Sequence, residues 1–283
     1  MCTAVRFTDG QGNLFFGRNL DWSFDYGQGV MRTPGDADVP AAFERPADPA
    51  RGHDVIGVGI TALGVPLYFD CANDAGLAVA GLNFPQSAHY AAGPVDGTVN
   101  VAAYEFPYWV ARSFGTVAEV RAALAGVTVV AKAVSEQLPV ANLHWIVADA
   151  TGAIVDVLTN EPNFGWHRQN LRNYLTLTDA DPEPVSWGSA ELRAFGSGEG
   201  LRGVPGDYSG PSRFVKVAFV NAHYPVQSGE KDNVTRLFRT LGSVGVPEGC
   251  EKTLYTSGFS AATRTYYYAT YDDPQVRAYP FAG

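Results

Sequence analysis

The chain has 283 residues, 46% of them apolar and 17% charged, which suits one globular domain spanning residues 1–283. Its net charge of −9, without a cluster of Lys and Arg, argues against a nucleic-acid partner, and its five histidines lack metal-ligand spacing. The most apolar stretch, Val55–Phe69, is too short to span a membrane. The three cysteines, Cys2, Cys71 and Cys250, are too few for a disulfide framework, and this favours a location in the reducing cytoplasm.

Cys2 combines two reactive groups if Met1 is removed. One residue then carries a thiol and the free α-amino group, which titrates at about pH 8 and can accept a proton near neutrality. Pairing a side-chain nucleophile with an N-terminal amine is a known way of activating it. The alternative is that Cys2 is only an early residue of a first strand.

A hairpin is predicted at the start of the chain. Two apolar runs between Thr3 and Gly17 flank the turn-rich segment Asp9–Asn13. Cys2 therefore begins a strand, and an antiparallel return brings Arg18 and Asp21 beside it. The same two charges, three residues apart, could instead form an ordinary surface ion pair.

Three further strands are predicted before the chain turns helical. The segment Gly35–Arg51, rich in Pro, Ala and Asp, is expected to be an exposed loop. Ile56–Ile60, Val65–Cys71 and Leu77–Leu82 follow as short apolar runs separated by turn residues. Such a meander predicts an antiparallel sheet.

Two helices come next. Thr116–Glu119 has the capping-box pattern and predicts an amphipathic helix that extends to Val127. Val101–Phe114 is expected to be a helix interrupted near Pro107.

Strands and helices then come in blocks, which indicates an α+β protein with layered sheets and helices. The remaining predicted strands are Leu143–Ala148, Ala153–Leu158, Thr253–Tyr255 and Thr265–Thr270, and the remaining predicted helices are Arg213–Asn221 and Val234–Leu241, the second ending at Gly242.

Several motifs, in the same order along the chain, resemble the choloylglycine hydrolase family, which contains conjugated bile salt hydrolases and penicillin V acylases. The resemblance runs from Cys2 to the C-terminus. It implies the N-terminal-nucleophile hydrolase fold, a four-layer αββα sandwich of two antiparallel sheets. The motifs are Met1–Thr3, Phe16–Trp22, Tyr68–Asn73, Gly81–Pro85, Leu158–Pro162, Pro205–Tyr208 and Pro211–Phe214.

The resemblance assigns roles at the N-terminal hairpin. Cys2 matches the family's nucleophile, whose own amine acts as the general base. Arg18 matches an arginine beside the sulfur, where a fixed positive charge favours the thiolate. Asp21 matches a carboxylate that orients the α-amino group.

Three more positions match residues of the family's active centre. Asn83 is expected to form the oxyanion hole with a backbone N–H, and Asn160 is expected to position the amine, the substrate amide or both. Arg213 is expected to hold the charge network together. Read without the resemblance, the asparagines near Pro85 and Pro162 suit turns, and Arg213 suits a helix surface.

The implied reaction is hydrolysis of a secondary amide through a Cys2 thioester, without a metal or organic cofactor. An asparagine at position 83 resembles the pattern of the family's bile salt hydrolase branch, so glycine- and taurine-conjugated bile salts are the expected substrates. The resemblance also implies a homotetramer. Penicillin V or acyl-homoserine lactone acylase activity is the alternative, and a catalytically impaired steroid- or lipid-binding protein is another. The side chains expected to line an apolar pocket, or else to belong to the core, are Leu20, Phe24, Tyr26, Leu63 and Leu138.

One departure from the family pattern lies near residues 153–157. The family usually has a longer hairpin there, and the segment before Thr253 and the C-terminal tail are also short. Shortening at a hairpin tip is tolerated more easily than loss of paired strand, so the deletion bears on stability, activity and assembly.

Overall fold

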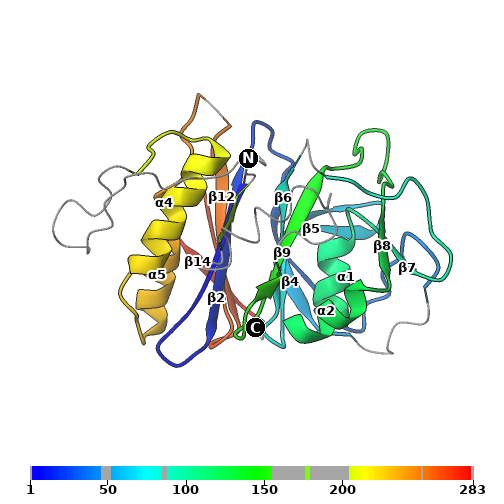
Figure 1. Cartoon of the computed structure of the whole chain (residues 1–283), viewed down its shortest axis with the longest axis horizontal. Coiled ribbons are helices and arrows are strands. Elements are labelled where there is room, and N and C mark those ends of the chain that lie inside the picture. Colours follow the sequence, from blue (N-terminus) through cyan, green and yellow to red (C-terminus); the bar gives the residue numbers. More distant parts are fainter. Residues whose placement is uncertain are drawn as a thin grey trace.

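A computed structural model describes residues 2–45, 52–84, 88–154, 176–178, 204–249 and 251–281. Two six-stranded sheets face each other, and helices cover both outer faces (Figure 1). The predicted αββα sandwich is therefore confirmed.

The first sheet is antiparallel throughout and has the strand order β11-β1-β2-β12-β13-β14. Its centre is the predicted N-terminal hairpin of β1 and β2. Its strands are β1 (Cys2–Thr8), β2 (Leu14–Asp21), β11 (Thr176–Thr178), β12 (Thr253–Ser260), β13 (Thr265–Thr270) and β14 (Arg277–Pro280).

The second sheet is also antiparallel and has the order β10-β9-β6-β5-β4-β3. The predicted meander forms its β4, β5 and β6. Its strands are β3 (Gly29–Thr33), β4 (Val55–Ala62), β5 (Val65–Asn73), β6 (Ala78–Asn83), β9 (Leu143–Ala148) and β10 (Ala153–Ile154), and a separate parallel pair joins β7 (Val99–Ala102) and β8 (Val127–Val130).

Each sheet carries its own pair of helices. α1 (Phe106–Ser113) and α2 (Val117–Leu124) pack on the second sheet, whereas α4 (Gly210–His223) and α5 (Glu230–Gly242) pack on the first (Figure 1). The predicted capping box is present at the start of α2, where Thr116 and Glu119 satisfy each other's backbone N–H groups.

Both faces of the N-terminal hairpin are buried, because successive side chains of a strand point to opposite faces. Ala4 and Phe16 pack between the two sheets, while Val5 and Phe15 pack outward beneath α5. Gly17 permits the close approach of the helix, since a Cβ there would lie 3.1–3.2 Å from two α5 leucine methyls. The hairpin is thus fixed from both sides.

Several predicted elements differ from the structure. The expected helix Val101–Phe114 is β7 followed by α1, because Pro107 occupies the first turn of α1, where proline is well tolerated. Val127 belongs to β8, since α2 ends at Leu124. The strand expected over Ala153–Leu158 is described only for its first two residues, and the rest lies outside the described residues.

Candidate active site

The register of the N-terminal hairpin determines which side chains meet Cys2. Cys2 pairs with Leu20, and Ala4 pairs with Arg18. Directly opposed residues share a face of an antiparallel sheet, so Cys2, Arg18 and Leu20 face the second sheet. Asp21 follows on the opposite face, toward the helices.

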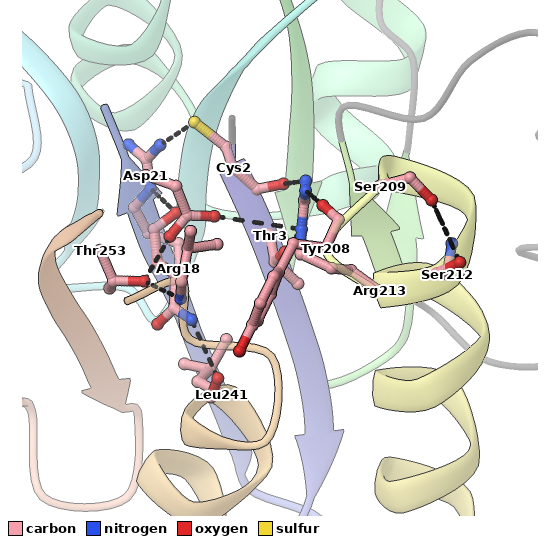
Figure 2. Close-up of polar contacts among 12 residues, drawn as sticks. Cys2, Thr3, Arg18, Asp21, Tyr208, Ser209, Ser212, Arg213, Leu241 and Thr253 are labelled. Carbon is pink, nitrogen blue, oxygen red and sulfur yellow. Dashed lines mark hydrogen bonds and ion pairs between the residues drawn. The ribbon is translucent and has the colours of Figure 1, made fainter. Parts of the chain in front are cut away.

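On the inner face, a buried arginine contacts the buried sulfur. Arg18 Nη2 lies 2.8 Å from Cys2 Sγ, and both side chains are inaccessible to solvent (Figure 2). Burial alone would lower the pKa of Arg18, but the acidic groups of Tyr255, Cys2 and Asp70 outweigh it and raise that pKa. The guanidinium is therefore a permanent positive charge beside the thiol.

On the outer face, Arg213 of α4 contacts the backbone of the same strand (Figure 2). Its Nη2 donates to the Cys2 carbonyl at 3.2 Å, and its Nε donates to Thr3 Oγ1 at 3.3 Å. The same Nε lies 4.0 Å from Asp21 Oδ2. Arg213 thus links α4 to the main chain of β1 and to the Asp21 carboxylate.

Asp21 is fully buried at the end of β2. Thr253 Oγ1 donates to its Oδ1 at 2.6 Å. Burial raises the pKa of Asp21, although the bond from Thr253 and the charge of Arg213 act in the opposite direction. A buried carboxylate whose pKa is raised by burial is stabilised in its ionised form by a further N–H donor or cation, such as an amine.

The N-terminus of α4 places Arg213. Ser209 is the N-cap and accepts a bond from the Ser212 backbone N–H, and Ser212 Oγ donates to Asp207 Oδ2 at 2.6 Å. Arg213 Nη1 donates to the Tyr208 carbonyl within this same turn. The serine hydrogen bonds lower the pKa of Asp207 to about 2.

Two residues of the site were not assigned a role from sequence. Arg18 Nη1 lies 3.7 Å from Asp70 Oδ1 and donates to Tyr255 Oη at 3.2 Å. An aspartate inside a buried apolar strand was the available signal for Asp70, because ionised residues are seldom buried without a partner. Tyr255 lies too far along the chain for any local pattern to connect it with Arg18.

Exposed aromatic side chains lie near the arginine. Phe24 and Tyr26 are 59% and 38% exposed and pack edge to face, with ring centroids 4.9 Å apart. Tyr26 also contacts the half-buried Phe69, 5.7 Å between centroids, whose carbonyl accepts a bond from Arg18 Nη1. These rings offer an apolar surface adjoining the site.

The remaining residues that the sequence predicted for the site lie on several different elements. Leu20 is partly buried against the core between the sheets. Leu63 lies at the tip of the β4–β5 turn with its side chain 78% exposed, and Leu138 is half-buried between β8 and β9. Asn83 is half-buried at the end of β6, a strand that lies against β1. Asn160 lies outside the described residues.

Among the residues that the structure describes, no group of three or more His, Cys, Asp or Glu side chains could hold a metal ion. Over the same residues, the helices are all too short or too polar to cross a bilayer.

A buried cysteine at the start of a central strand, within an αββα sandwich, is the arrangement expected of an N-terminal-nucleophile amide hydrolase. The family model for linear amide C–N hydrolases of the choloylglycine hydrolase family matches residues 2–282. The chain belongs to this family.

Relatives match over nearly the whole chain. A bile salt hydrolase/transferase of Bifidobacterium longum subsp. longum is 49% identical over 305 aligned residues, covering 100% of this chain and 96% of the relative. A conjugated bile acid hydrolase of Lactobacillus acidophilus is 43% identical, with 99% and 95% covered.

Solved structures are similar as well. The C2A variant of the conjugated bile acid hydrolase from Clostridium perfringens is 29% identical, with a TM-score of 0.77 over 99% of this chain and 92% of that one. An R18L variant of the same enzyme is 28% identical, with the same TM-score and coverage. The two substitutions carry the numbers and residue types of Cys2 and Arg18 here.

Proposed function

We propose that this chain is a bile salt hydrolase that cleaves the amide bond of glycine- or taurine-conjugated bile acids through a thioester on Cys2. The observation that carries the proposal is the 2.8 Å contact between Arg18 Nη2 and Cys2 Sγ at the start of β1. The names of the relatives supply the substrate class.

The first chemical step requires removal of Met1, which frees the amine of Cys2. The amine takes the thiol proton, and the sulfur attacks the amide carbonyl. Arg18 stabilises the thiolate, and Asp21 orients the amine, for which its buried carboxylate offers an acceptor. Arg213 holds the Cys2 carbonyl, so that the reacting residue has a fixed orientation.

The tetrahedral intermediate places negative charge on the former carbonyl oxygen. We assign the Asn83 side chain and a backbone N–H to that oxygen, and Asn160 to positioning of the amine or the substrate amide. A donor of this kind is worth about 2.7–4 kcal/mol in the transition state. The proton held by the amine then passes to the departing nitrogen of glycine or taurine. Water subsequently cleaves the thioester and releases the bile acid.

A steroid nucleus needs a broad apolar surface. Phe24 and Tyr26, with Leu20 beside Cys2, are proposed to contact it, and Leu63 and Leu138 are proposed to lie at its edges. The exposure of Phe24 and Tyr26 supports this role, because large aromatic side chains left in water often mark binding surfaces.

The organisation of the chain is part of the proposal. We propose one domain over residues 1–283, with a hairpin shortened near 153–157, acting as a cytoplasmic homotetramer. The alignment with the Bifidobacterium relative spans 305 residues, more than the 283 of this chain, which supports the shortening. Size-exclusion chromatography with light scattering tests the assembly.

The deciding assay measures the release of glycine or taurine from a panel of conjugated bile salts, beside the release of the penicillin nucleus from penicillin V. Release of the amino acid supports the proposal. Penicillin V turnover faster by orders of magnitude would favour the acylase alternative, and bile salt binding without turnover would favour a binding protein.

Two cysteine variants provide a matched pair. Cys2→Ser is expected to lose most turnover while still binding bile salt. Cys71→Ser should keep its turnover, because that thiol is buried on the second sheet and burial raises its pKa well above the ordinary value. Intact-mass measurement shows whether Met1 has been removed. Full activity of Cys2→Ser would exclude the nucleophile assignment.

A further inference from the structure

Asp70 is a buried acid that none of the steps above uses. It lies within β5, and its side chain is 2% exposed. Removing a carboxylate from water carries an energetic penalty of several kcal/mol unless hydrogen bonds and an opposite charge compensate it.

The compensation comes from the opposite sheet. Tyr255 Oη donates to Asp70 Oδ1 at 2.6 Å, and Ser257 Oγ donates to Oδ2 at 2.7 Å. Tyr266 Oη makes a further bond to Oδ2. Only an ionised carboxylate accepts at both oxygens without donating, so three hydroxyl donors suit the charged form. Burial raises the pKa of Tyr266 well above its ordinary value, as the neighbouring Asp70 also does, so that phenol remains a donor.

Arg18 connects this carboxylate to the active site. One guanidinium nitrogen, Nη2, contacts Cys2 Sγ, and the other, Nη1, faces Asp70 Oδ1 at 3.7 Å. Tyr255 Oη touches both partners, since it accepts from Arg18 Nη1 at 3.2 Å and donates to Asp70. Arg18 is therefore shared between the Asp70 carboxylate and the reactive thiol of Cys2.

We propose that Asp70 is a positioning residue of the active site: as the buried counter-ion of Arg18, it controls through Arg18 how readily the thiol of Cys2 ionises. The proposal rests on the proposed function only in taking Cys2 as the nucleophile. While Cys2 is a neutral thiol, Asp70 alone balances the buried guanidinium. When the thiolate forms, two anions share one cation and repel each other, so Asp70 limits the stabilisation that Arg18 gives to the thiolate.

Further charged and titratable groups surround Asp70, Arg18 and Cys2. Arg213 on α4 and Asp21 on β2 face the backbone side of Cys2. The groups that face Asp70 or Arg18 are Cys2 on β1, Tyr255 on β12, Tyr266 and Tyr268 on β13, and Cys71 on β5.

The test is Asp70→Asn in the full-length enzyme. Asparagine keeps the shape and an acceptor for Tyr255, and Arg18 keeps its bonds to the carbonyls of Asn19 and Phe69. The rate of Cys2 alkylation by iodoacetamide is followed against pH, with peptide mass mapping to separate Cys2 from the other thiols. The midpoint pH of alkylation is expected to fall by about one unit. The plateau rate is expected to fall roughly threefold, because nucleophilicity declines with basicity.

Tyr266→Phe is the matched control. It removes a buried hydroxyl from Asp70 but leaves the charge and the Arg18 contacts intact. Its alkylation midpoint is expected to stay at the wild-type value. The acidic limb of kcat/KM should move with the alkylation midpoint in Asp70→Asn, and it should not move in the control.

Every outcome decides the proposal. A lower midpoint in Asp70→Asn alone supports it. An unchanged midpoint shows no coupling, a higher one shows that Arg18 has moved, and equal shifts in both variants show a packing effect; each of these overturns it. If Asp70→Asn does not fold, Asp70→Ser removes the same charge and carries the same expectation. Failure of the proposed function looks different, because amide hydrolysis would then be absent or independent of Cys2.

Discussion

Arg213→Met is the substitution that most directly tests how the site is held together. Methionine retains much of the buried apolar stem, but it removes every polar contact of the guanidinium. The lost partners include the carbonyls of Cys2 and Tyr208, the Thr3 hydroxyl and the Asp21 carboxylate. The change therefore detaches α4 from the start of β1 at a single point.

The structure sets the expected size of the effect. Breaking a buried ion pair by removing one partner reduces the free energy of unfolding by about 3–5 kcal/mol. Burial lowers the pKa of Arg213, which shows that the guanidinium itself is costly to bury, and its removal relieves that cost. We therefore expect the lower end, about 3 kcal/mol. Turnover should fall about 100-fold, because small displacements of reacting groups have effects of that order.

Urea denaturation gives the stability, and amide hydrolysis gives kcat. Arg236→Met is the matched control, because Arg236 is a similarly buried arginine on α5 that bonds to the Asn221 carbonyl and lies over the Phe7 ring. It should lose stability and keep its kcat. If Arg213→Met keeps the wild-type kcat, or if both variants lose kcat equally, the reasoning that Arg213 fixes Cys2 is refuted.

Three further substitutions test the scaffold around the site. Asp207→Asn should destabilise the protein at neutral pH, and the difference in urea midpoint from wild type should fade as the pH falls from about 4 to 2, because the folded-state pKa of Asp207 is lowered to about 2. Gly17→Ala should reduce the free energy of unfolding by about 2–4 kcal/mol, since the added Cβ would lie 2.5 Å from the Ser257 carbonyl, whereas Gly29→Ala, with open space around it, should be near neutral in the same denaturation assay. Thr116→Ala should reduce the free energy of unfolding by about 1 kcal/mol, because it removes the N-cap of α2. Since α2 contributes no residue to the site around Cys2, kcat should be unchanged, and a loss of kcat would contradict this expectation.

Local patterns were sufficient for the elements that carry their own signals. The turn residues Asp9–Asn13 identified the N-terminal hairpin, and the alternating apolar runs identified the meander. The short strands β3, β11 and β14 were not anticipated, because edge strands of three to five residues are defined by what they pair with. Pro107, at the start of α1, was wrongly predicted to interrupt a helix. The effect of a proline depends on its position within the helix, and the sequence pattern did not give that position.

In the active site, too, the contacts within the N-terminal hairpin could be predicted and the contacts between the two sheets could not. The hairpin alone predicts that Arg18 returns beside Cys2, because the turn fixes the register. The partners of Arg18 on the far side could not be predicted, since Asp70 and Tyr255 meet it only when the two sheets stack. Sequence periodicity assigns a residue to a face, but it does not identify the residue on the facing sheet.

The sulfur and the main chain of Cys2 are contacted from opposite faces of the first sheet. Because Cys2 lies in β1, its sulfur points between the sheets while its backbone remains accessible from the helical side. Arg18 acts on the sulfur from one layer, and Arg213 acts on the main chain from another. Neither arginine can replace the other, since each is separated from the other's target by the sheet itself. The ionisation of the thiol and the placement of the amine can therefore be altered independently, which is why the Asp70 and Arg213 variants are expected to give different signatures.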